Sequence, residues 1–309
     1  MPLAAIVLEF DPVARFDVWA IRWQTLAAAA VVLLALGLAA RRAAGVDRGA
    51  AVPGGPQRLD AQSRLRLGDL LFLAIAAIPG AVVGGRAVHV LAYLGYYSAN
   101  PGFILDPARG SLSLLGAVIG GTATAAYAAS LLGIPVRRWL DVVAPAALVG
   151  IGLGKLSLVL GGEGQGTPFA GDWALAFTGE GPWHSLAPSI PAHPAQVYEG
   201  LWNLAGALLL ALLLAGPVVR RMPAAVRQTG SYAVRQEARG QTVVPGALRF
   251  GVIFLAGLAW FLLGRVIVGF AWKDPPAVGA LNAEQLVAVV ALLAIALGIG
   301  IALARSARR

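Results

Sequence analysis

The sequence predicts an all-α membrane protein with about seven transmembrane helices, its N-terminus outside the cell and its C-terminus in the cytoplasm. Of the 309 residues, 58% are hydrophobic and only 13% are charged, whereas soluble domains carry about 25% charged residues. The mean hydropathy is +0.75. The apolar residues also gather in long runs separated by short basic connections. The solvent for most of this chain is therefore lipid.

These runs are long enough to cross a bilayer. A spanning helix needs about 20 mostly apolar residues, because each residue rises about 1.5 Å through a hydrocarbon core about 30 Å thick. We expect spans at Ile21–Ala40, Leu70–Leu94, Leu112–Leu132, Val142–Leu160, Ala195–Gly216, Leu248–Phe270 and Leu281–Leu303. An odd number of spans places the two ends of the chain on opposite sides of the membrane.

The distribution of basic residues predicts which side is which, because Lys and Arg stay preferentially in cytoplasmic connections. Arginines are concentrated in residues 41–67 and 217–247, at Arg137 and Arg138, and after the last span. The long connection 161–192 lies on the opposite side and contains neither Lys nor Arg. We therefore expect residues 161–192 outside.

We interpret residues 1–309 as a single polytopic membrane domain. Connections 41–67 and 217–247 are predicted to be cytoplasmic loops without much fixed structure, because they are rich in Gly, Pro or polar residues. Connection 161–192 mixes Trp and Phe with Gly and Pro, which is typical of a folded outer cap at the lipid headgroups. Glycines four residues apart predict close helix packing. These pairs are Gly80 and Gly84, Gly116 and Gly120, and Gly150 and Gly154.

The composition also limits the chemistry. There is no cysteine, so the chain has no disulfide, no thiol nucleophile and no thiolate metal site. Any thiol chemistry must use the sulfur of a substrate. The formal charge of +9 does not indicate a nucleic-acid partner, because the arginines lie in short loops between apolar runs, where membrane proteins carry them.

Four charged residues stay at or toward the outer leaflet: Arg86, Lys155, Glu163 and Arg265. A charge in hydrocarbon costs about 2.5–3.5 kcal/mol on insertion scales, so such a residue is paired, hydrated or functional. Two interpretations stay open. The arginines form buried ion pairs with Glu199 or Glu163 that hold the bundle together, or their guanidinium groups bind a lipid phosphate.

The fifth span opens with His193-Pro194-Ala195-Gln196-Val197-Tyr198-Glu199. Proline favours a helix start, and the polar residues after it enter the membrane on successive turns. Gln196 and Glu199 share one helix face. His193 lies near the start of the helix, where it either titrates near neutral pH or makes a structural hydrogen bond.

Further motifs surround this one along nearly the whole chain. They are Phe10-Asp11-Pro12 with Ile21-Arg22-Trp23, then Gly84-Gly85-Arg86, Gly116 with Gly120-Gly121, Gly150-Ile151-Gly152-Leu153-Gly154-Lys155 with Gly162-Glu163-Gly164-Gln165-Gly166, Arg265-Val266-Ile267-Val268-Gly269-Phe270, Lys273-Asp274-Pro275 and Asn282-Ala283-Glu284-Gln285. Together with the histidine motif, they resemble the sequence of the prolipoprotein diacylglyceryl transferase family. That resemblance implies a multi-pass enzyme of the bacterial plasma (inner) membrane. It would transfer diacylglycerol from phosphatidylglycerol to the lipobox cysteine of a preprolipoprotein and release glycerol 1-phosphate.

The chain departs from the family pattern at several polar positions. Gln24 replaces a tyrosine, Leu115 a histidine, Lys155 an arginine, Leu158 and Gly161 two asparagines, His89 a tyrosine and Gly269 a glutamate. A lysine keeps the charge of arginine but loses its bidentate fork. A leucine can neither donate nor accept a hydrogen bond.

The resemblance implies a set of site residues and no cofactor or metal. Expected catalytic residues are Arg265, His193 and Glu163, with His89 as a further candidate proton acceptor. Expected substrate-binding residues are Arg86, Lys155, Gly166, Gln196, Tyr198, Glu199 and Arg22. Phosphatidylglycerol and a lipobox peptide would be the partners.

Two other functions are considered. A catalytically inactive relative would bind phospholipid or a lipoprotein precursor, and the lost polar residues favour this alternative. A small transporter would need discontinuous helices and charges at midplane. The enzyme hypothesis expects Arg86, Lys155, Glu163, Gln196 and Arg265 to converge on one lipid-accessible cavity, whereas separate ion pairs would count against it.

Overall fold

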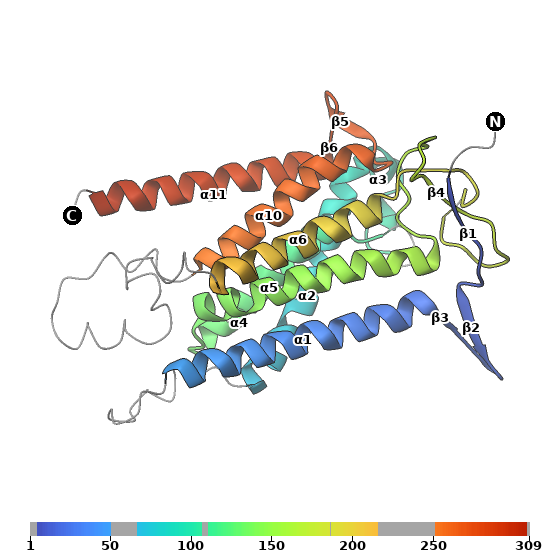
Figure 1. Ribbon diagram of the computed structural model, residues 1–309. Helices are drawn as coiled ribbons and strands as arrows, with labels where there is room; N and C mark the ends of the chain where they lie inside the picture. The colour runs from blue at the N-terminus through green and yellow to red at the C-terminus, as the bar shows by residue number, and fades with distance from the viewer. Residues whose placement is uncertain (1–4, 51–66, 107–110, 186, 216–250, 308–309) are drawn as a thin grey trace.

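The computed structural model describes residues 5–50, 67–106, 111–185, 187–215 and 251–307. Within these ranges, seven helices are long and apolar enough to cross a membrane, as predicted (Figure 1). They are α1 (Trp23–Ala50), α2 (Leu67–Ala92), α4 (Leu114–Leu131), α5 (Val136–Ser157), α6 (Ala195–Ala215), α10 (Val252–Val268) and α11 (Ala283–Ala307).

Two helix boundaries differ clearly from the prediction. α1 continues to Ala50 instead of ending at Ala40, because the alanine-rich residues after the apolar run still favour a helix. α5 begins at Val136 instead of Val142, since Pro135 pre-organises a helix start ahead of the apolar run. The remainder of the predicted loop 41–67, the whole of loop 217–247 and the predicted span residues 216 and 248–250 lie outside the described residues.

The prediction of an all-α fold needs a correction, because the chain is mostly helical and also contains three two-stranded sheets. Their strands contain two to four residues each, too short for an alternating pattern to be recognised in the sequence. The sheets are β1 (Ile6–Leu8) with β4 (Leu175–Phe177), parallel; β2 (Val13–Phe16) with β3 (Trp19–Arg22), antiparallel; and β5 (Pro276–Val278) with β6 (Leu281–Asn282), antiparallel.

The strands gather toward one end of the bundle, and the C-terminal end of α11 lies at the other (Figure 1). Four short helical segments also belong to the fold: α3 (Leu94–Ala99), η2 (Pro101–Phe103), η3 (Leu158–Gly161) and η5 (Gly269–Ala271). We call the end of the bundle toward which the strands gather the strand-bearing end. It is the end at which most of the expected site residues lie.

The residues of connection 161–192 that the structure describes contain a short strand and several defined contacts. β4 pairs with β1 from the start of the chain. The Phe177 side chain is 1% exposed, and its ring lies 4.9 Å from that of Trp183. Gln165 Nε2 donates to the backbone oxygen of Leu175 at 3.1 Å. The strand pair attaches the connection to β1, and the other two contacts hold the connection together internally.

Small residues set how closely the helices pack. A Cβ atom added at Gly84 would collide with the Gly116 carbonyl oxygen, and one added at Gly80 would collide with that of Gly120. The predicted packing role of these two glycine pairs in α2 and α4 is confirmed. Of the third pair, Gly150 packs closely, because a Cβ there would lie 3.1 Å from Ala35 Cβ of α1, whereas a Cβ at Gly154 would have no neighbour within 4 Å. Gly152, between them, faces α6, and a Cβ there would lie 2.9 Å from the Gly200 carbonyl oxygen.

Two polar contacts fix α10 in the bundle. The Trp202 indole of α6 donates to the Trp260 carbonyl at 2.9 Å, and the Trp260 indole donates to the Trp202 carbonyl at 2.8 Å. The two rings stack with centroids 4.6 Å apart. At the far end of α10, Asp141 of α5 accepts from the backbone nitrogens of Gly251 at 2.7 Å and Phe254 at 2.9 Å, so it satisfies free donors of that helix start.

Candidate active site at the strand-bearing end

Two cations and two carboxylates form a buried cluster between four helices. The Glu199 carboxylate of α6 contacts Lys155 Nζ of α5 at 2.8 Å and Arg265 Nη1 of α10 at 2.7 Å. The second amino group of Arg265, Nη2, pairs with Glu284 of α11. The side chain of Glu199 is 1% exposed and that of Arg265 is 7% exposed. With all four groups ionised, the cluster carries no net charge.

Trp272 forms an aromatic wall of this cluster. Lys155 Nζ lies 4.7 Å from the centroid of its ring, and the guanidinium carbon of Arg265 lies 5.9 Å from it. A cation facing an aromatic ring is attracted by the negative potential of the ring face. The residue comes directly after η5 and α10, so the same stretch of chain supplies both Arg265 and the ring that covers it.

Gln196 lies one turn before Glu199 on α6 and is fully buried. Neither its amide oxygen nor its amide nitrogen has a hydrogen-bond partner among the described residues. Leu158 lies close by, because a Cβ at Gly164 would meet both Gln196 and Leu158 at 2.9 and 3.3 Å. The apolar Leu158 offers this amide no hydrogen bond, and a buried polar group without a partner costs free energy.

Glu163 is held by Gln24 from the start of α1. Gln24 Nε2 donates to Glu163 Oε2 at 2.7 Å. A Cβ at position 161 would collide with the amide oxygen of Gln24. The absence of a side chain at Gly161 therefore makes room for Gln24, so that two of the departures from the family pattern fit each other in space.

His193 belongs to an aromatic cluster at the cap. Its ring stacks on Phe169 with centroids 4.0 Å apart, and its Nδ1 lies 3.3 Å from the Tyr198 hydroxyl. That hydroxyl accepts from Trp173 Nε1 at 2.8 Å. Helix α6 begins at Ala195, one residue after Pro194, as the sequence predicts.

Gly166 and Arg22 support the surroundings of this cluster. The backbone nitrogen of Gly166 donates to the His193 carbonyl at 2.8 Å, and a Cβ at Gly166 would collide with the Ala271 carbonyl oxygen. Arg22, at the end of β3, donates from Nη1 to the Pro182 carbonyl at 3.0 Å. Both contacts join the cap to neighbouring segments.

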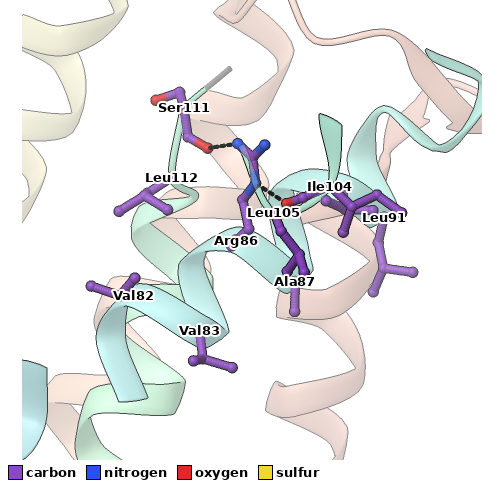
Figure 2. Close-up of a pocket in the computed structure, with 10 residues that line it drawn as sticks. Val82, Val83, Arg86, Ala87, Leu91, Ile104, Leu105, Ser111 and Leu112 are labelled. Atoms are coloured by element: carbon purple, nitrogen blue, oxygen red, sulfur yellow. Dashed lines mark hydrogen bonds between the residues drawn. The ribbon is translucent and has the colours of Figure 1, made fainter. Parts of the chain in front are cut away.

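Arg86 lies in a different environment, a cavity of about 910 Å³ lined mainly by aliphatic side chains of α2 and of the segments after α3. Its guanidinium donates to backbone oxygens, with Nε at 2.7 Å from Ile104 and Nη2 at 2.5 Å from Phe103 and 3.0 Å from Asp106. Figure 2 shows the guanidinium between Ile104 and Ser111, with Val82, Val83 and Leu91 around it. No carboxylate lies within ion-pair distance among the described residues.

His89 lies one turn after Arg86. Its Nε2 accepts from the backbone nitrogen of Ser111 at 3.3 Å, and its ring lies 4.8 Å from that of Tyr93. The Tyr93 hydroxyl donates to Asp274 Oδ1 at 2.8 Å. Burial and the neighbouring Asp274 carboxylate raise the pKa of Tyr93 above its ordinary value. The hydrogen bond between Tyr93 and Asp274 connects the end of α2 to the segment that follows Trp272.

The expected site residues thus separate into groups, and they do not all converge on one cavity as the enzyme hypothesis expected. Lys155, Glu199 and Arg265 meet in one cluster, Glu163 pairs with Gln24, and Arg86 binds backbone carbonyls in its own cavity. The predicted ion pair between Arg265 and Glu199 is present. Sequence reasoning did not assign a site role to Glu284 or Trp272. The signal for Glu284 was present, since it is a further charge at the start of an apolar run.

A second cavity of about 350 Å³ lies between α1, α2, α4 and α5 and is lined almost entirely by alanine and aliphatic side chains. Leu115, where the family has a histidine, is fully buried in an apolar cluster with Leu148, Phe261 and Leu262. Neither location offers an acid, a base or a charge. No three His, Asp or Glu side chains within the described ranges could together hold a metal ion.

Seven apolar helices and a neutral cluster of buried charges define a multi-pass membrane protein with a polar site at one end of its helix bundle. A model of the family described as prolipoprotein diacylglyceryl transferase matches residues 12–238. The chain belongs to this family.

Individual relatives support the same membership. A phosphatidylglycerol–prolipoprotein diacylglyceryl transferase of Synechococcus elongatus is 28% identical over 272 residues, which cover 88% of this chain and 80% of the relative. Proteins of the same name from Trichormus variabilis and Geobacter sulfurreducens are 30% identical over 75% of the chain and 72% of the relative, and 35% identical over 48% of the chain and 52% of the relative. The first two alignments span most of both proteins.

Proposed function

We propose that this protein transfers the diacylglyceryl group of phosphatidylglycerol to the cysteine thiol of a preprolipoprotein. In this reaction the substrate sulfur bonds to the glyceryl carbon while the bond from that carbon to a phosphate oxygen breaks. The thiol proton passes to a base, and glycerol 1-phosphate leaves. The observation that carries the proposal is the cluster of Lys155, Glu199, Arg265 and Glu284 in a chain of this family.

Arg265 and Lys155 are proposed to stabilise the leaving phosphate. Negative charge grows on the phosphate oxygen as its bond to carbon breaks, and fixed cations in a dry site stabilise such charge far better than water does. Both cations are held in place by Glu199, so little reorganisation is needed when the phosphate arrives. Arg265 has the greater part, because its guanidinium carries N–H donors beyond the one on Nη1 that contacts Glu199.

The base is proposed from three candidates. Glu163 is oriented by Gln24, and a carboxylate held by a single donor keeps lone pairs for a thiol proton. His193 is in contact with Tyr198, and His89 lies at the other side of the site next to Tyr93. We favour Glu163, because it is attached to the segment that follows Lys155 on the same helix end.

The remaining residues are proposed to bind or position the substrates. Gln196 has an unpaired buried amide that could be satisfied by the lipid headgroup, and Glu199 holds both cations. Tyr198, Gly166 and Arg22 position the cap around His193. Arg86 is proposed to bind a headgroup oxygen in its own cavity, because its Nη1 contact to Ser111 is long at 3.5 Å and leaves capacity for a further acceptor.

We further propose the membrane setting. The chain acts as one polytopic domain in the bacterial inner membrane, with its N-terminus and the cap 161–192 outside and the connections 41–67 and 217–247 in the cytoplasm. The absence of basic residues from 161–192 supports this orientation. The lipobox peptide would then approach from the outer side, and the basic loops need no nucleic-acid partner.

A second candidate is a relative that binds phospholipid without transferring its diacylglyceryl group. The observation that favours it is the buried amide of Gln196, which has no hydrogen-bond partner among the described residues, with the apolar Leu158 near the Cβ of Gln196. A site that lacks one of its hydrogen bonds can retain binding while orienting the reacting atoms less well.

The test incubates the purified full chain with phosphatidylglycerol and a lipobox peptide and measures the peptide mass. We expect the mass of diacylglyceryl on the peptide, and none on a matched peptide with serine in place of cysteine. Unmodified peptide, together with measured lipid binding, would reject the transferase and favour the second candidate.

A further inference from the structure

Arg265 has two carboxylate partners on two different helices. Its Nη1 contacts Glu199 of α6 at 2.7 Å, and its Nη2 contacts Glu284 of α11. Gly269 lies four residues, about one helical turn, after Arg265. It has no side chain, although the family pattern has a glutamate at this position. A Cβ there would lie 2.6 Å from Gln285 Cγ. The second carboxylate therefore reaches Arg265 from the neighbouring helix.

The start of α11 is fixed independently of the charge of Glu284. The backbone nitrogen of Asn282 donates to Gln285 Oε1, and that of Gln285 donates to Asn282 Oδ1, both at 2.8 Å. This reciprocal pair resembles a capping box. Gln285 Nε2 also donates to the Val266 carbonyl at 2.8 Å, next to Arg265. Glu284 is thus held at the end of α10 by its neighbours.

Glu284 and a substrate phosphate would need the same donors. Glu199 contacts both Lys155 and Arg265, whereas Arg265 is the one cation of this cluster that Glu284 contacts. Its side chain is 12% exposed, whereas that of Glu199 is 1% exposed. Of the two carboxylates, Glu284 is therefore the one that an arriving anion can displace.

We propose that Glu284 is a positioning residue that orients the Arg265 guanidinium and competes with the phosphate group for its Nη2. The competition keeps the cluster neutral when no anion is bound and favours release of glycerol 1-phosphate after transfer. This inference rests on the proposed function, because it takes the anion to be the phosphate of that reaction.

The experiment measures the affinity of the purified full chain for glycerol 1-phosphate by calorimetry, together with kcat and KM for phosphatidylglycerol. Glu284→Gln removes the charge and keeps the shape. We expect it to bind glycerol 1-phosphate on the order of tenfold more tightly, because the cluster gains one net positive charge. KM should fall, and kcat should fall with it as product release slows. Glu284→Asp should lie between this variant and the original chain.

Asp141→Asn is the matched control, since Asp141 is a buried carboxylate that caps α10 at the opposite end and has no contact with Arg265. It should lower the melting temperature without raising the affinity for glycerol 1-phosphate. Unchanged or weaker affinity in Glu284→Gln would overturn the inference, even if the original chain transfers diacylglyceryl. If Glu284→Gln does not fold, unchanged affinity in Glu284→Asp overturns it instead. Tighter binding in a chain that transfers nothing supports the role of Glu284 and rejects the proposed function.

Discussion

Arg265 and Arg86 are two arginines on helices that are long and apolar enough to cross a membrane, and their partners differ in kind. Arg265 faces carboxylates from two helices, whereas Arg86 faces backbone carbonyls from the segment after α3. Carboxylates neutralise a guanidinium and can be exchanged for a phosphate. Backbone carbonyls leave the charge in place and fix a loop. The comparison teaches that an arginine on such a helix can be held by carboxylates that a phosphate can replace, or by backbone carbonyls whose position it fixes.

The largest expected effect is at Arg265. Arg265→Ala should abolish diacylglyceryl transfer and lower the free energy of unfolding by about 3–5 kcal/mol, because it leaves Glu284 without its cation and Glu199 with Lys155 alone. Arg265→Lys keeps the charge without the fork, so it should recover stability more than transfer. Thermal unfolding in detergent and peptide mass spectrometry measure the two quantities. Full transfer by Arg265→Ala would contradict a role of this residue in the reaction.

The comparison predicts a different result at Arg86. Arg86→Ala should cost about 1.5–3 kcal/mol of stability through lost hydrogen bonds of a charged group, with a smaller loss of transfer than Arg265→Ala. Limited proteolysis can compare the residues around Phe103 and Ile104 in the two variants. Equal loss of transfer in both variants, at equal stability, would remove the distinction drawn between the two arginines.

A smaller gain is expected at Leu158. Leu158→Asn offers the buried Gln196 amide a partner, so we expect about 1 kcal/mol of added stability and faster transfer. Leu158→Ala is the control, since it opens the same space without a hydrogen-bonding group. Both the melting temperature and the transfer rate should rise only in the asparagine variant, and an equal response of the two variants would show that Gln196 does not need a partner.

The smallest effect concerns Tyr93, which connects the side of Arg86 to the segment after Trp272. Its raised pKa means that the protonated hydroxyl is favoured in the folded chain. This contribution is complete below the unfolded pKa of about 10 and is lost as pH rises through the folded value. Tyr93→Phe should cost about 0.5–1.5 kcal/mol near neutral pH, and the difference from the original chain should shrink above pH of about 10. Unfolding measured from neutral to alkaline pH tests this.

The seven spans could be predicted because each depends on a local apolar run, and the start of α6 followed from Pro194. The pairing of β1 with β4 could not be predicted, because it joins three residues near the start of the chain to three residues beyond residue 174. Neither short segment contains a pattern that identifies the other as its partner. The same holds for Arg86. Its partners are backbone carbonyls, which every residue carries, so no side-chain pattern identifies them.

The charged cluster was partly predictable for a physical reason. Charges in hydrocarbon need opposite charges, so Glu199 was an expected partner of Arg265. Which carboxylate takes the second amino group depends on how α10 and α11 pack around Gly269, and packing distances are not written in one sequence. The pairing of Gln24 with Glu163 could not be predicted either, because it depends on how closely Gln24 packs against Gly161.

The stacked indoles of Trp202 on α6 and Trp260 on α10 fix how these two helices are aligned along their axes, and so fix the positions of Glu199 and Arg265 in the charged cluster. Each ring lies against a glycine of the partner helix, Trp202 at Gly264 and Trp260 at Gly206, and each donates to the backbone of the other helix. A slip of one residue between the helices would break both hydrogen bonds. It would also turn Arg265 by about 100° around its axis, away from Glu199. Two aromatic residues deeper in the bundle thus determine which charges can meet at its end.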